Sequence, residues 1–336
     1  QREGRLPYVW KCALLNLAIN RRKRREDNSG SKRRIIKYKT IFTVFSKGTM
    51  PIMDYQYIET NGIRLNVAQA GSPDAPLVIL LHGFPEFSYG WRKQIPALVE
   101  AGYRVWAPDQ RGYNLSDKPD GLAAYSLDEL AKDIIGLIDA ADEKEAFLVG
   151  HDWGAAVAWW VAAKYPDRIS KLVNMNVPHG AVMQKHLRSN FAQLLKSWYI
   201  FFFQIPYLPE ILARLRNWKM LSEMLKKSAH PNTFSDEDLD HYRQSWSQPK
   251  AYRSMLNWYR AFVQKPPTPP ASSRIIVPTL LIWGAQDTAL GREMAQPSID
   301  RCDDGRLVFI EEATHWVQHD EAEKVNKLLI NFLSAK

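Results

Sequence analysis

The segment AFLVGHDWGAAVAWWVAAK, residues 146–164, decides the fold that we expect for this chain. It opens with a short apolar run, typical of a buried strand, and ends with an Ala- and Trp-rich stretch typical of a helix. The pentapeptide Gly150-His151-Asp152-Trp153-Gly154 joins them, and its two glycines allow a sharp turn that projects the central side chain into a cleft. The segment therefore predicts Asp152 at the end of a strand in an α/β sheet.

Strand-like and helix-like segments alternate from Asp54 onward. This alternation predicts an α/β protein with an eight-stranded, mostly parallel sheet covered by helices on both faces. One helix is expected to begin at Ser126, where Glu129 completes the pattern of a capping box. The expected strands are residues 55–59, 64–70, 77–81, 104–107, 146–149, 171–177, 279–283 and 306–310.

A helical insertion interrupts the alternation for about a hundred residues after Val177. It is rich in aromatic residues and ends in the run Lys265-Pro266-Pro267-Thr268-Pro269-Pro270, which cannot lie inside a helix or a central strand. We therefore expect a helical lid over residues 179–270, inserted between two parts of an α/β core at 54–178 and 271–336.

The excess positive charge of the chain lies near its N-terminus. Residues 1–49 hold 14 Lys/Arg and 3 Asp/Glu, a net charge of +11. The whole chain carries +9, so the remaining residues carry −2. Such a segment could be a basic arm or a targeting signal. We favour a disordered, solvated extension, or sequence translated ahead of an internal start at Met50 or Met53. Because the charge is confined there and no recognition motif accompanies it, we expect no nucleic-acid partner.

Membrane and redox signals are weak. No window contains the ~20 consecutive apolar residues of a membrane span. Only Cys12 and Cys302 occur, which excludes a disulfide framework for the main body. We therefore expect no integral membrane span, and a cytoplasmic monomer or homodimer.

Asp152 occupies the position that serine holds in the common G-x-S-x-G turn, and this changes the available chemistry. A carboxylate can attack an sp³ carbon and leave an ester, whose carbonyl carbon water then attacks. Acyl transfer is therefore disfavoured. The plain alternative is that Asp152 only caps the helix that follows it.

Two more side chains complete a catalytic triad at the ends of strands. His315 follows the last expected strand and would activate water, and Asp287 ends the preceding strand and would orient the histidine. The loop after residues 77–81 supplies the backbone N–H of Phe84, which with that of Trp153 would form an oxyanion hole.

Three neighbouring features are expected to be structural. His82 lies in a loop whose role is to present backbone, and His151 is interpreted in the same way. The segment Asp109-Gln110-Arg111-Gly112-Tyr113 is interpreted as a network that braces its loop.

From Asp54 to the C-terminus, the chain resembles the epoxide hydrolases of the α/β-hydrolase fold, of soluble and microbial type. The resemblance implies that Asp152 opens an epoxide, that His315 and Asp287 activate water, and that a vicinal diol leaves, with no cofactor and no metal. Its motifs are His82-Gly83-Phe84-Pro85-Glu86, Asp109-Gln110-Arg111-Gly112, Gly150-His151-Asp152-Trp153-Gly154, Trp283-Gly284-Ala285-Gln286-Asp287 and His315-Trp316-Val317-Gln318.

Ring opening creates an alkoxide, which a phenol in the lid could protonate. The family usually has two lid tyrosines, and Leu256-Asn257-Trp258-Tyr259-Arg260 nominates Tyr259 as the second. The first should precede Phe-Gln, where this chain has Phe202. Tyr199 or Tyr207 could replace it, although core packing explains either one.

An apolar pocket for a small apolar epoxide is expected from aromatic residues in the lid and the core. Its expected lining residues are Trp91, Phe202 and Trp258.

Two other functions remain open. A haloalkane dehalogenase also uses an Asp nucleophile followed by Trp, but it typically carries Asn where this chain has Phe84, and Tyr259 would have no purpose there. A catalytically silent hydrolase scaffold that binds ligands or proteins is the third hypothesis, and the retained nucleophile, acid and base argue against it.

Overall fold

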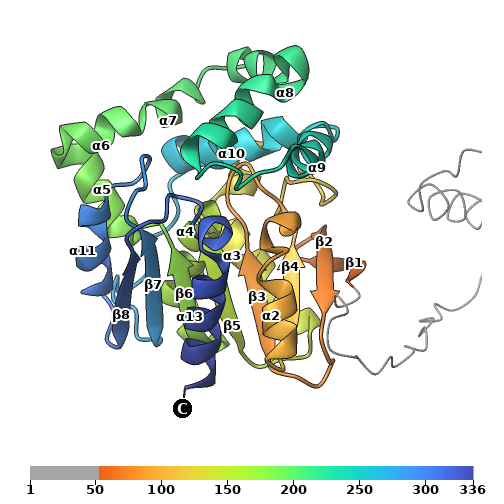
Figure 1. Cartoon of the computed structure of the whole chain (residues 1–336), viewed down its shortest axis with the longest axis vertical. Coiled ribbons are helices and arrows are strands. Elements are labelled where there is room, and N and C mark those ends of the chain that lie inside the picture. The colour runs from red at the N-terminus through yellow and green to blue at the C-terminus, as the bar shows by residue number, and fades with distance from the viewer. Residues whose placement is uncertain (1–52, 336) are drawn as a thin grey trace, which may run out of the picture. The chain divides into compact units, whose positions relative to one another are not determined.

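The computed structural model describes residues 53–335, so the basic extension expected at 1–49 lies outside the described residues. Eight strands form one sheet in the order β1-β2-β4-β3-β5-β6-β7-β8 (Figure 1). All eight expected strands are present, each within two residues of its expected bounds, and the predicted fold class is confirmed. The strands are β1 (Asp54–Thr60), β2 (Ile63–Ala70), β3 (Leu77–Leu81), β4 (Arg104–Pro108), β5 (Ala146–His151), β6 (Ile169–Met175), β7 (Thr279–Gly284) and β8 (Gly305–Ile310).

One strand runs against the rest. β2 pairs antiparallel with β1 and with β4, whereas every pairing from β4 to β8 is parallel. Asn61 and Gly62 join β1 to β2 with φ values of 43° and 75°, the left-handed conformation that a tight hairpin turn requires. The carboxyl ends of β3, β5, β6, β7 and β8 therefore share one edge of the sheet, as the placement of the motifs required.

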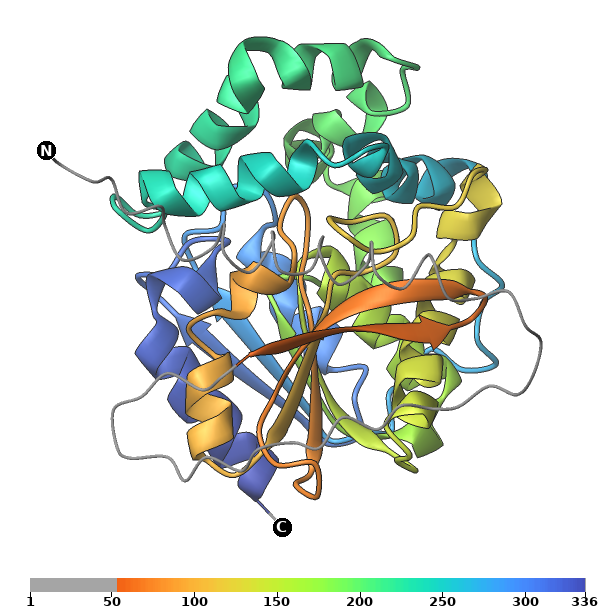
Figure 2. The same ribbon diagram turned by 90° about the vertical axis from the view of Figure 1, so that its right-hand side faces the viewer.

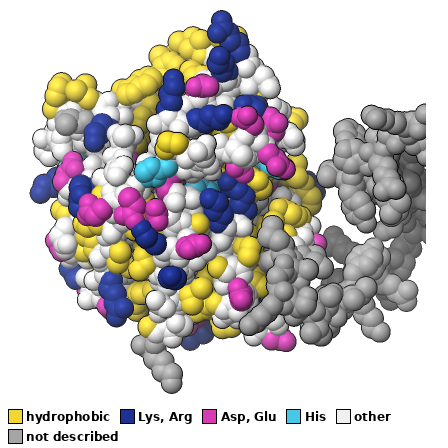
Figure 3. Space-filling model, in the orientation of Figure 1, with side chains coloured by type: hydrophobic (Ala, Val, Ile, Leu, Met, Phe, Trp, Pro, Cys, Tyr) yellow, Lys and Arg dark blue, Asp and Glu magenta, His cyan; other side chains and the backbone are white. Residues whose placement is uncertain are grey.

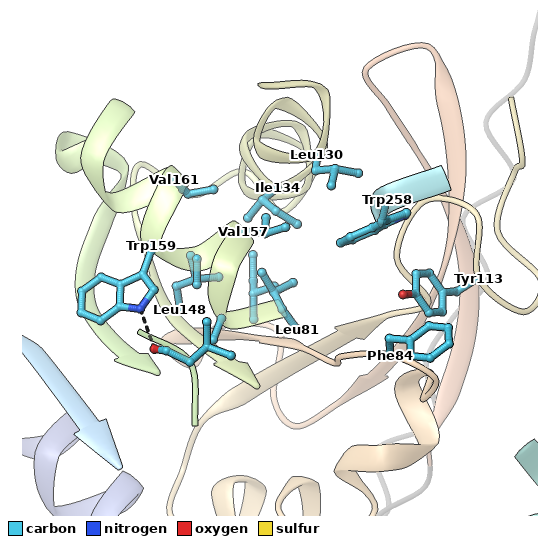
Figure 4. Close-up of a cluster of buried hydrophobic side chains, with 14 of the residues drawn as sticks. Leu81, Phe84, Tyr113, Leu130, Ile134, Leu148, Val157, Trp159, Val161 and Trp258 are labelled. Atoms are coloured by element: carbon cyan, nitrogen blue, oxygen red, sulfur yellow. Dashed lines mark hydrogen bonds between the residues drawn. The ribbon is translucent and has the colours of Figure 1, made fainter. Parts of the chain in front are cut away.

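Helices cover both faces of the sheet because its central strands are apolar on both sides. Along β3, Leu77, Ile79 and Leu81 pack into the cluster beneath α3 and α4, while Val78 and Leu80 pack into the cluster beneath α2 and α13. Figure 2 shows α2 and α13 on one side of the sheet and α3 and α4 on the other. Figure 4 shows part of the first cluster. These helices are α2 (Ile95–Glu100), α3 (Leu127–Ala140), α4 (Trp153–Lys164) and α13 (Ala322–Ser334).

The capping box expected at the start of α3 forms only in part. The Ser126 hydroxyl accepts from the Glu129 N–H at 3.5 Å. The Glu129 carboxylate does not return the bond, because it accepts from Lys132 at 2.7 Å and from Asn61 at 3.1 Å. The hydrogen bonds from Lys132 and from Asn61 in the β1–β2 turn therefore replace the expected bond between the Glu129 carboxylate and the Ser126 N–H.

Six helices between β6 and β7 lie above the sheet and form the segment that we call the lid (Figure 1). α8 is two helices that meet at a kink, since Arg216, Asn217 and Trp218 all have positive φ. No helix in the described part of the chain has the length and apolar composition needed to cross a membrane. The lid helices are α5 (Gly180–Ser189), α6 (Phe191–Lys196), α7 (Trp198–Phe202), α8 (Leu208–Ser228), α9 (Asp236–Trp246) and α10 (Ala251–Gln264). The remaining helices are α11 (Ala295–Ile299), α12 (Val317–Asp320) and the short 3₁₀ turns η1 (Ser88–Trp91), η2 (Leu122–Tyr125), η3 (Pro166–Arg168) and η4 (Arg292–Met294).

Candidate active site

Asp152 lies at the junction of β5 and α4 in an unusual backbone conformation, with φ 49° and ψ −125°. The turn is tight enough to require glycine on both sides. A Cβ on Gly150 would overlap the backbone of Ala155, and one on Gly154 would overlap the carbonyl of Leu81. The Asp152 side chain makes no capping hydrogen bond to α4. The capping alternative is therefore wrong, and the carboxylate is free for another role.

The three side chains predicted as a triad lie together beneath the lid. His315 Nδ1 lies 2.7 Å from Asp287 Oδ2, and His315 Nε2 lies 3.7 Å from Asp152 Oδ2. Burial alone would lower the pKa of His315, but the charges of Asp287 and Asp152 outweigh it and raise that pKa to about 10. The resting site therefore holds an imidazolium between two carboxylates at neutral pH.

Asp287 is held by more than the histidine. Its Oδ2 accepts from the Asn176 side chain at 2.8 Å, and its Oδ1 accepts from the backbone N–H groups of Ala289 and Leu290 at 2.8 and 2.9 Å. Burial would raise the pKa of Asp287, but the charge of His315 and these hydrogen bonds lower it. Sequence reasoning missed Asn176, although it directly follows β6 at the same sheet edge.

One of the two backbone N–H groups predicted for the oxyanion hole, that of Phe84, faces the Asp152 carboxylate. The Phe84 N–H donates to Asp152 Oδ1 at 2.6 Å. Trp153 is the first residue of α4, where N–H groups have no acceptor within the helix. Gly83 allows this approach, because a Cβ there would overlap the Asp152 side chain.

Two lid phenols share the space above Asp152. The rings of Tyr199, on α7, and Tyr259, on α10, meet edge to face with centroids 5.9 Å apart. Burial, and after it the negative charge of Asp152, raises the pKa of both hydroxyls. Tyr259 also packs against Phe84 and Trp153, with centroids 5.3 and 5.0 Å apart. The structure thus brings Tyr199 to the site.

The structure does not bring two of the expected residues, Tyr207 and Trp91, to the site. Tyr207 is 65% exposed and packs against Arg253. Phe202 packs against Trp198 and Phe203, and its place in the substrate pocket stays a prediction. Trp91 is buried in the cluster on the opposite face of the sheet, beneath α2 and α13, and therefore lines no pocket at Asp152.

Trp258 supports the site from behind. Its ring packs against Trp153, with centroids 5.7 Å apart, and its Nε1 donates to the carbonyl of Arg111 at 3.0 Å. Figure 4 shows Trp258 beside Tyr113 and Phe84. Arg111 in turn makes a buried, two-bond ion pair with Asp133, at 2.7 and 2.6 Å. This loop braces the site, as expected from the sequence.

His82 and His151 are structural, as expected. The Gln110 N–H donates to His82 Nε2 at 3.0 Å, which joins two strand-end loops. His151 Nε2 donates to the carbonyl of His315 at 2.8 Å, so the nucleophile turn is tied directly to the loop of the proposed base.

Glu86 forms a buried junction below the site. Its carboxylate accepts from Tyr242 of α9 at 2.5 Å, from His319 Nε2 at 2.7 Å and from Gln318 at 3.1 Å. Burial would raise the pKa of Glu86, but its contacts with His319 and His151 hold that pKa well below its usual range. Glu86 therefore connects the lid to the loop that carries His315.

No group of three His, Cys, Asp or Glu side chains within residues 53–335 is arranged to hold a metal ion. A surface cavity of about 490 Å³ lies near the far end of α4, where Lys164, Pro270 and Arg274 line it. It contains none of the residues described above.

Comparisons with known proteins agree with this geometry. Residues 76–322 match the family model of the α/β hydrolase fold. The chain is 38% identical to epoxide hydrolase 4 of Homo sapiens over 287 residues, which cover 83% of this chain and 78% of that protein. The chain belongs to the epoxide hydrolase family of the α/β-hydrolase fold.

Bacterial proteins are similar to the same share of this chain. It is 46% identical to the AB hydrolase superfamily protein YfhM of Bacillus subtilis over 278 residues, or 83% of this chain and 97% of that protein. A crystal structure of the Bacillus megaterium epoxide hydrolase with an inhibitor superposes with a TM-score of 0.76 at 32% identity, covering 83% of this chain and all of that one. The sequence-based prediction of the family and of the enzyme class is confirmed.

Proposed function

We propose that this chain hydrolyses small apolar epoxides to vicinal diols in two steps, through an ester on Asp152. The observation that carries the proposal is the arrangement around one carboxylate. Asp152 receives the Phe84 N–H on Oδ1, faces His315 with Oδ2, and lies below two buried phenols. Nucleophile, oxyanion donor, base and acids therefore surround the same atoms.

Asp152 opens the ring in the first step. Oδ2 attacks an epoxide carbon, a carbon–oxygen bond forms, and the bond from that carbon to the ring oxygen breaks. The ring oxygen takes a proton from Tyr259 or Tyr199, both of which are fully protonated at neutral pH because their pKa values are raised. The rings of Phe84, Trp153 and Phe203 around Tyr259 provide an apolar setting for the substrate.

Esterification prepares the base for the second step. It removes the negative charge of Asp152, one of the two charges that raise the pKa of His315. The imidazolium can then give its proton to the phenolate left by ring opening. This proton replaces the one that the phenol gave to the product hydroxyl, and the histidine becomes neutral at the moment when a base is needed.

Water completes the reaction. Neutral His315 takes a proton from a water molecule, and the hydroxide attacks the ester carbonyl carbon of Asp152. The Phe84 N–H and the free N–H of Trp153 stabilise the oxyanion at Oδ1. Collapse of this intermediate breaks the ester bond, and the departing alkoxide takes the remaining proton of the added hydroxyl group. The diol then leaves, and the restored carboxylate keeps one oxygen taken from water.

The paired phenols favour an epoxide over a haloalkane. A departing halide needs N–H donors and no acid, so two buried hydroxyls above Asp152 would have no use in dehalogenation. Phe84 also stands where dehalogenases typically carry Asn. The silent scaffold would not require an imidazolium poised between two carboxylates.

Intact-protein mass spectrometry of the variant His315→Gln tests the proposal. Without the base, the ester should accumulate during incubation with an epoxide, and the protein should gain the whole mass of the substrate. A haloalkane would add only its alkyl part. The double variant Asp152→Asn with His315→Gln serves as the control and should gain nothing. An adduct from haloalkanes alone would support dehalogenation, and no adduct from either class would support the silent scaffold.

A further inference from the structure

The outer surface of the lid exposes an unusual number of apolar side chains. Of the 16 large hydrophobic side chains exposed in the described part of the chain, 11 lie between residues 191 and 224. Figure 3 shows hydrophobic groups along the upper rim of the molecule, over the lid helices, beside Lys and Arg. We call this surface the lid face and define it by its most exposed members, which are Phe191, Leu195, Trp198, Phe201, Tyr207 and Ile211.

The exposed apolar side chains of the lid face are not the core-facing side of an ordinary amphipathic helix. Phe191, Leu195, Trp198 and Phe201 follow one another at intervals of four, three and three residues, the spacing of one helical face. On the opposite side of α7, Ile200 is apolar and only 8% exposed, whereas α6 buries the polar side chain of Gln193. α7 is therefore apolar on both sides, and only one side packs against the described protein. A contiguous exposed apolar surface of this kind marks an interaction site.

Charge separates the lid face from the rest of the molecule. Residues 180–228 hold 8 Lys/Arg and 2 Asp/Glu, a formal charge of +6. The rest of residues 50–336 holds 23 Lys/Arg and 31 Asp/Glu, a charge of −8. One of the two acids, Glu210, is paired with Arg260. Within residues 180–228, six exposed basic side chains form no ion pair with any described residue, namely Lys185, Arg188, Lys196, Arg214, Arg216 and Lys219.

We propose that the lid face docks on the surface of an anionic phospholipid bilayer. Aromatic and aliphatic side chains beside lysines and arginines are the composition of a helix that lies in a membrane interface. The positive charge favours anionic headgroups. A second copy of this face would bring +6 against +6, and residues 1–49 of this chain carry +11, so charge disfavours both as the occupant.

Docking places the lid helix that carries Tyr199 at the lipid. α7 is only five residues long and presents Trp198 outward, while its neighbour Tyr199 packs against Tyr259 above Asp152. An apolar substrate dissolved in the bilayer would meet the lid before it meets bulk water.

Fluorescence quenching by brominated lipids tests whether Trp198 enters the bilayer. The full-length chain is mixed with vesicles of phosphatidylcholine and phosphatidylglycerol whose acyl chains carry bromine, and the Trp198→Phe variant serves as control. Phe preserves the apolar face, so this variant should bind as before but lose part of the quenching. The comparison is independent of any binding by residues 1–52, because both proteins contain them. Equal quenching in the two proteins would overturn the proposal.

Vesicle sedimentation tests the charge requirement. The variant Arg214→Glu with Arg216→Glu and Lys219→Glu should bind anionic vesicles at least tenfold more weakly, since each basic group near the surface contributes about fivefold. The control Lys144→Glu with Arg306→Glu and Lys327→Glu makes the same change of net charge on exposed residues outside the lid, and should retain most of the binding. Equal losses in the two triple variants would contradict a specific lid face.

The apolar requirement has its own control. Phe191→Ser with Leu195→Ser and Phe201→Ser should weaken vesicle binding at least tenfold, whereas Tyr55→Ser with Tyr57→Ser, two exposed aromatic residues on β1, should not. Epoxide turnover in water checks that each variant is folded. If sedimentation velocity shows a dimer that only the lid variant dissociates, and lipid quenching is absent, the face is a contact between copies and the proposal fails.

Discussion

His315 Nε2 lies 3.7 Å from Asp152 Oδ2, too far for an ordinary hydrogen bond but close enough for the two charges to interact strongly. Asp287 holds the other ring nitrogen at 2.7 Å. The gap on the Asp152 side leaves the carboxylate oxygen able to reach a substrate carbon. The same gap means that the charge state of Asp152 controls the basicity of His315 without a covalent or close contact.

Removing the charge of Asp152 should lower the pKa of His315. In the free enzyme this pKa is raised to about 10, and Asp152 contributes to the rise together with Asp287. Asp152→Asn keeps the shape of the ester stage while removing the charge, so the pKa of His315 should fall by more than one unit. Titration of the imidazole signals by NMR in both proteins measures this change. An unchanged pKa would contradict the proposed release of the base.

The stability of the fold should depend on the ionisation of His315. Its pKa in the folded state is above the unfolded value of about 6.5, so the paired imidazolium stabilises the fold fully below that pH. This contribution is lost as the pH rises through about 10. The difference in free energy of unfolding between the native chain and His315→Gln should therefore be a few kcal/mol near pH 6 and shrink toward pH 10. Denaturant unfolding at both pH values provides the measurement, and a constant difference would count against the ion pairs.

The two lid phenols should act on ring opening and leave ester hydrolysis unchanged. Tyr259→Phe and Tyr199→Phe should each slow formation of the ester about tenfold or more, and the double variant should lose about 10²–10⁴-fold. Single-turnover kinetics separates the two steps. Tyr207→Phe serves as the control, because Tyr207 is 65% exposed and packs against Arg253, and it should leave the rate of ester formation unchanged. Full activity in the double variant would remove the acid role from the lid.

The conformation of Asp152 should make glycine unusually favourable at that position. With φ 49° and ψ −125°, any residue with a Cβ is strained there by about 1–3 kcal/mol. Asp152→Gly should consequently be more stable than Asp152→Ala by about 1 kcal/mol, the reverse of the usual order. Chemical denaturation of the two inactive variants gives the comparison, and a less stable glycine variant would argue against a strained turn.

Strand periodicity and the positions of strand ends were sufficient to predict the sheet and the grouping of three side chains at its edge. Parallel strands bring their carboxyl ends to one edge, so Asp152, Asp287 and His315 could be assigned together although up to 163 residues separate them. Each of the three follows an apolar run that is easily recognised as a strand. The loop that carries Phe84 could be predicted in the same way, because it follows the apolar strand at residues 77–81.

The side chains that sequence reasoning misplaced depend on short-range geometry that periodicity does not resolve. The choice between Tyr199 and Tyr207 depends on where the chain turns between α7 and α8, which places Tyr199 against Tyr259 and leaves Tyr207 exposed. Trp91 was expected in the pocket, but η1 carries it to the opposite face of the sheet. The contact of Asn176 with Asp287 could not be predicted, because only its position after a strand distinguishes Asn176 in the sequence.

The central claim is that the Asp152 carboxylate becomes esterified and that water then attacks its carbonyl carbon. Repeated turnover of an epoxide in water enriched in ¹⁸O, followed by proteolysis and mass spectrometry, tests this directly. The peptide that contains Asp152 should gain about 2 Da for each oxygen replaced, and tandem fragmentation should place the label on that side chain. A labelled diol formed while Asp152 remains unlabelled would show that water attacks the substrate itself, and would contradict the account.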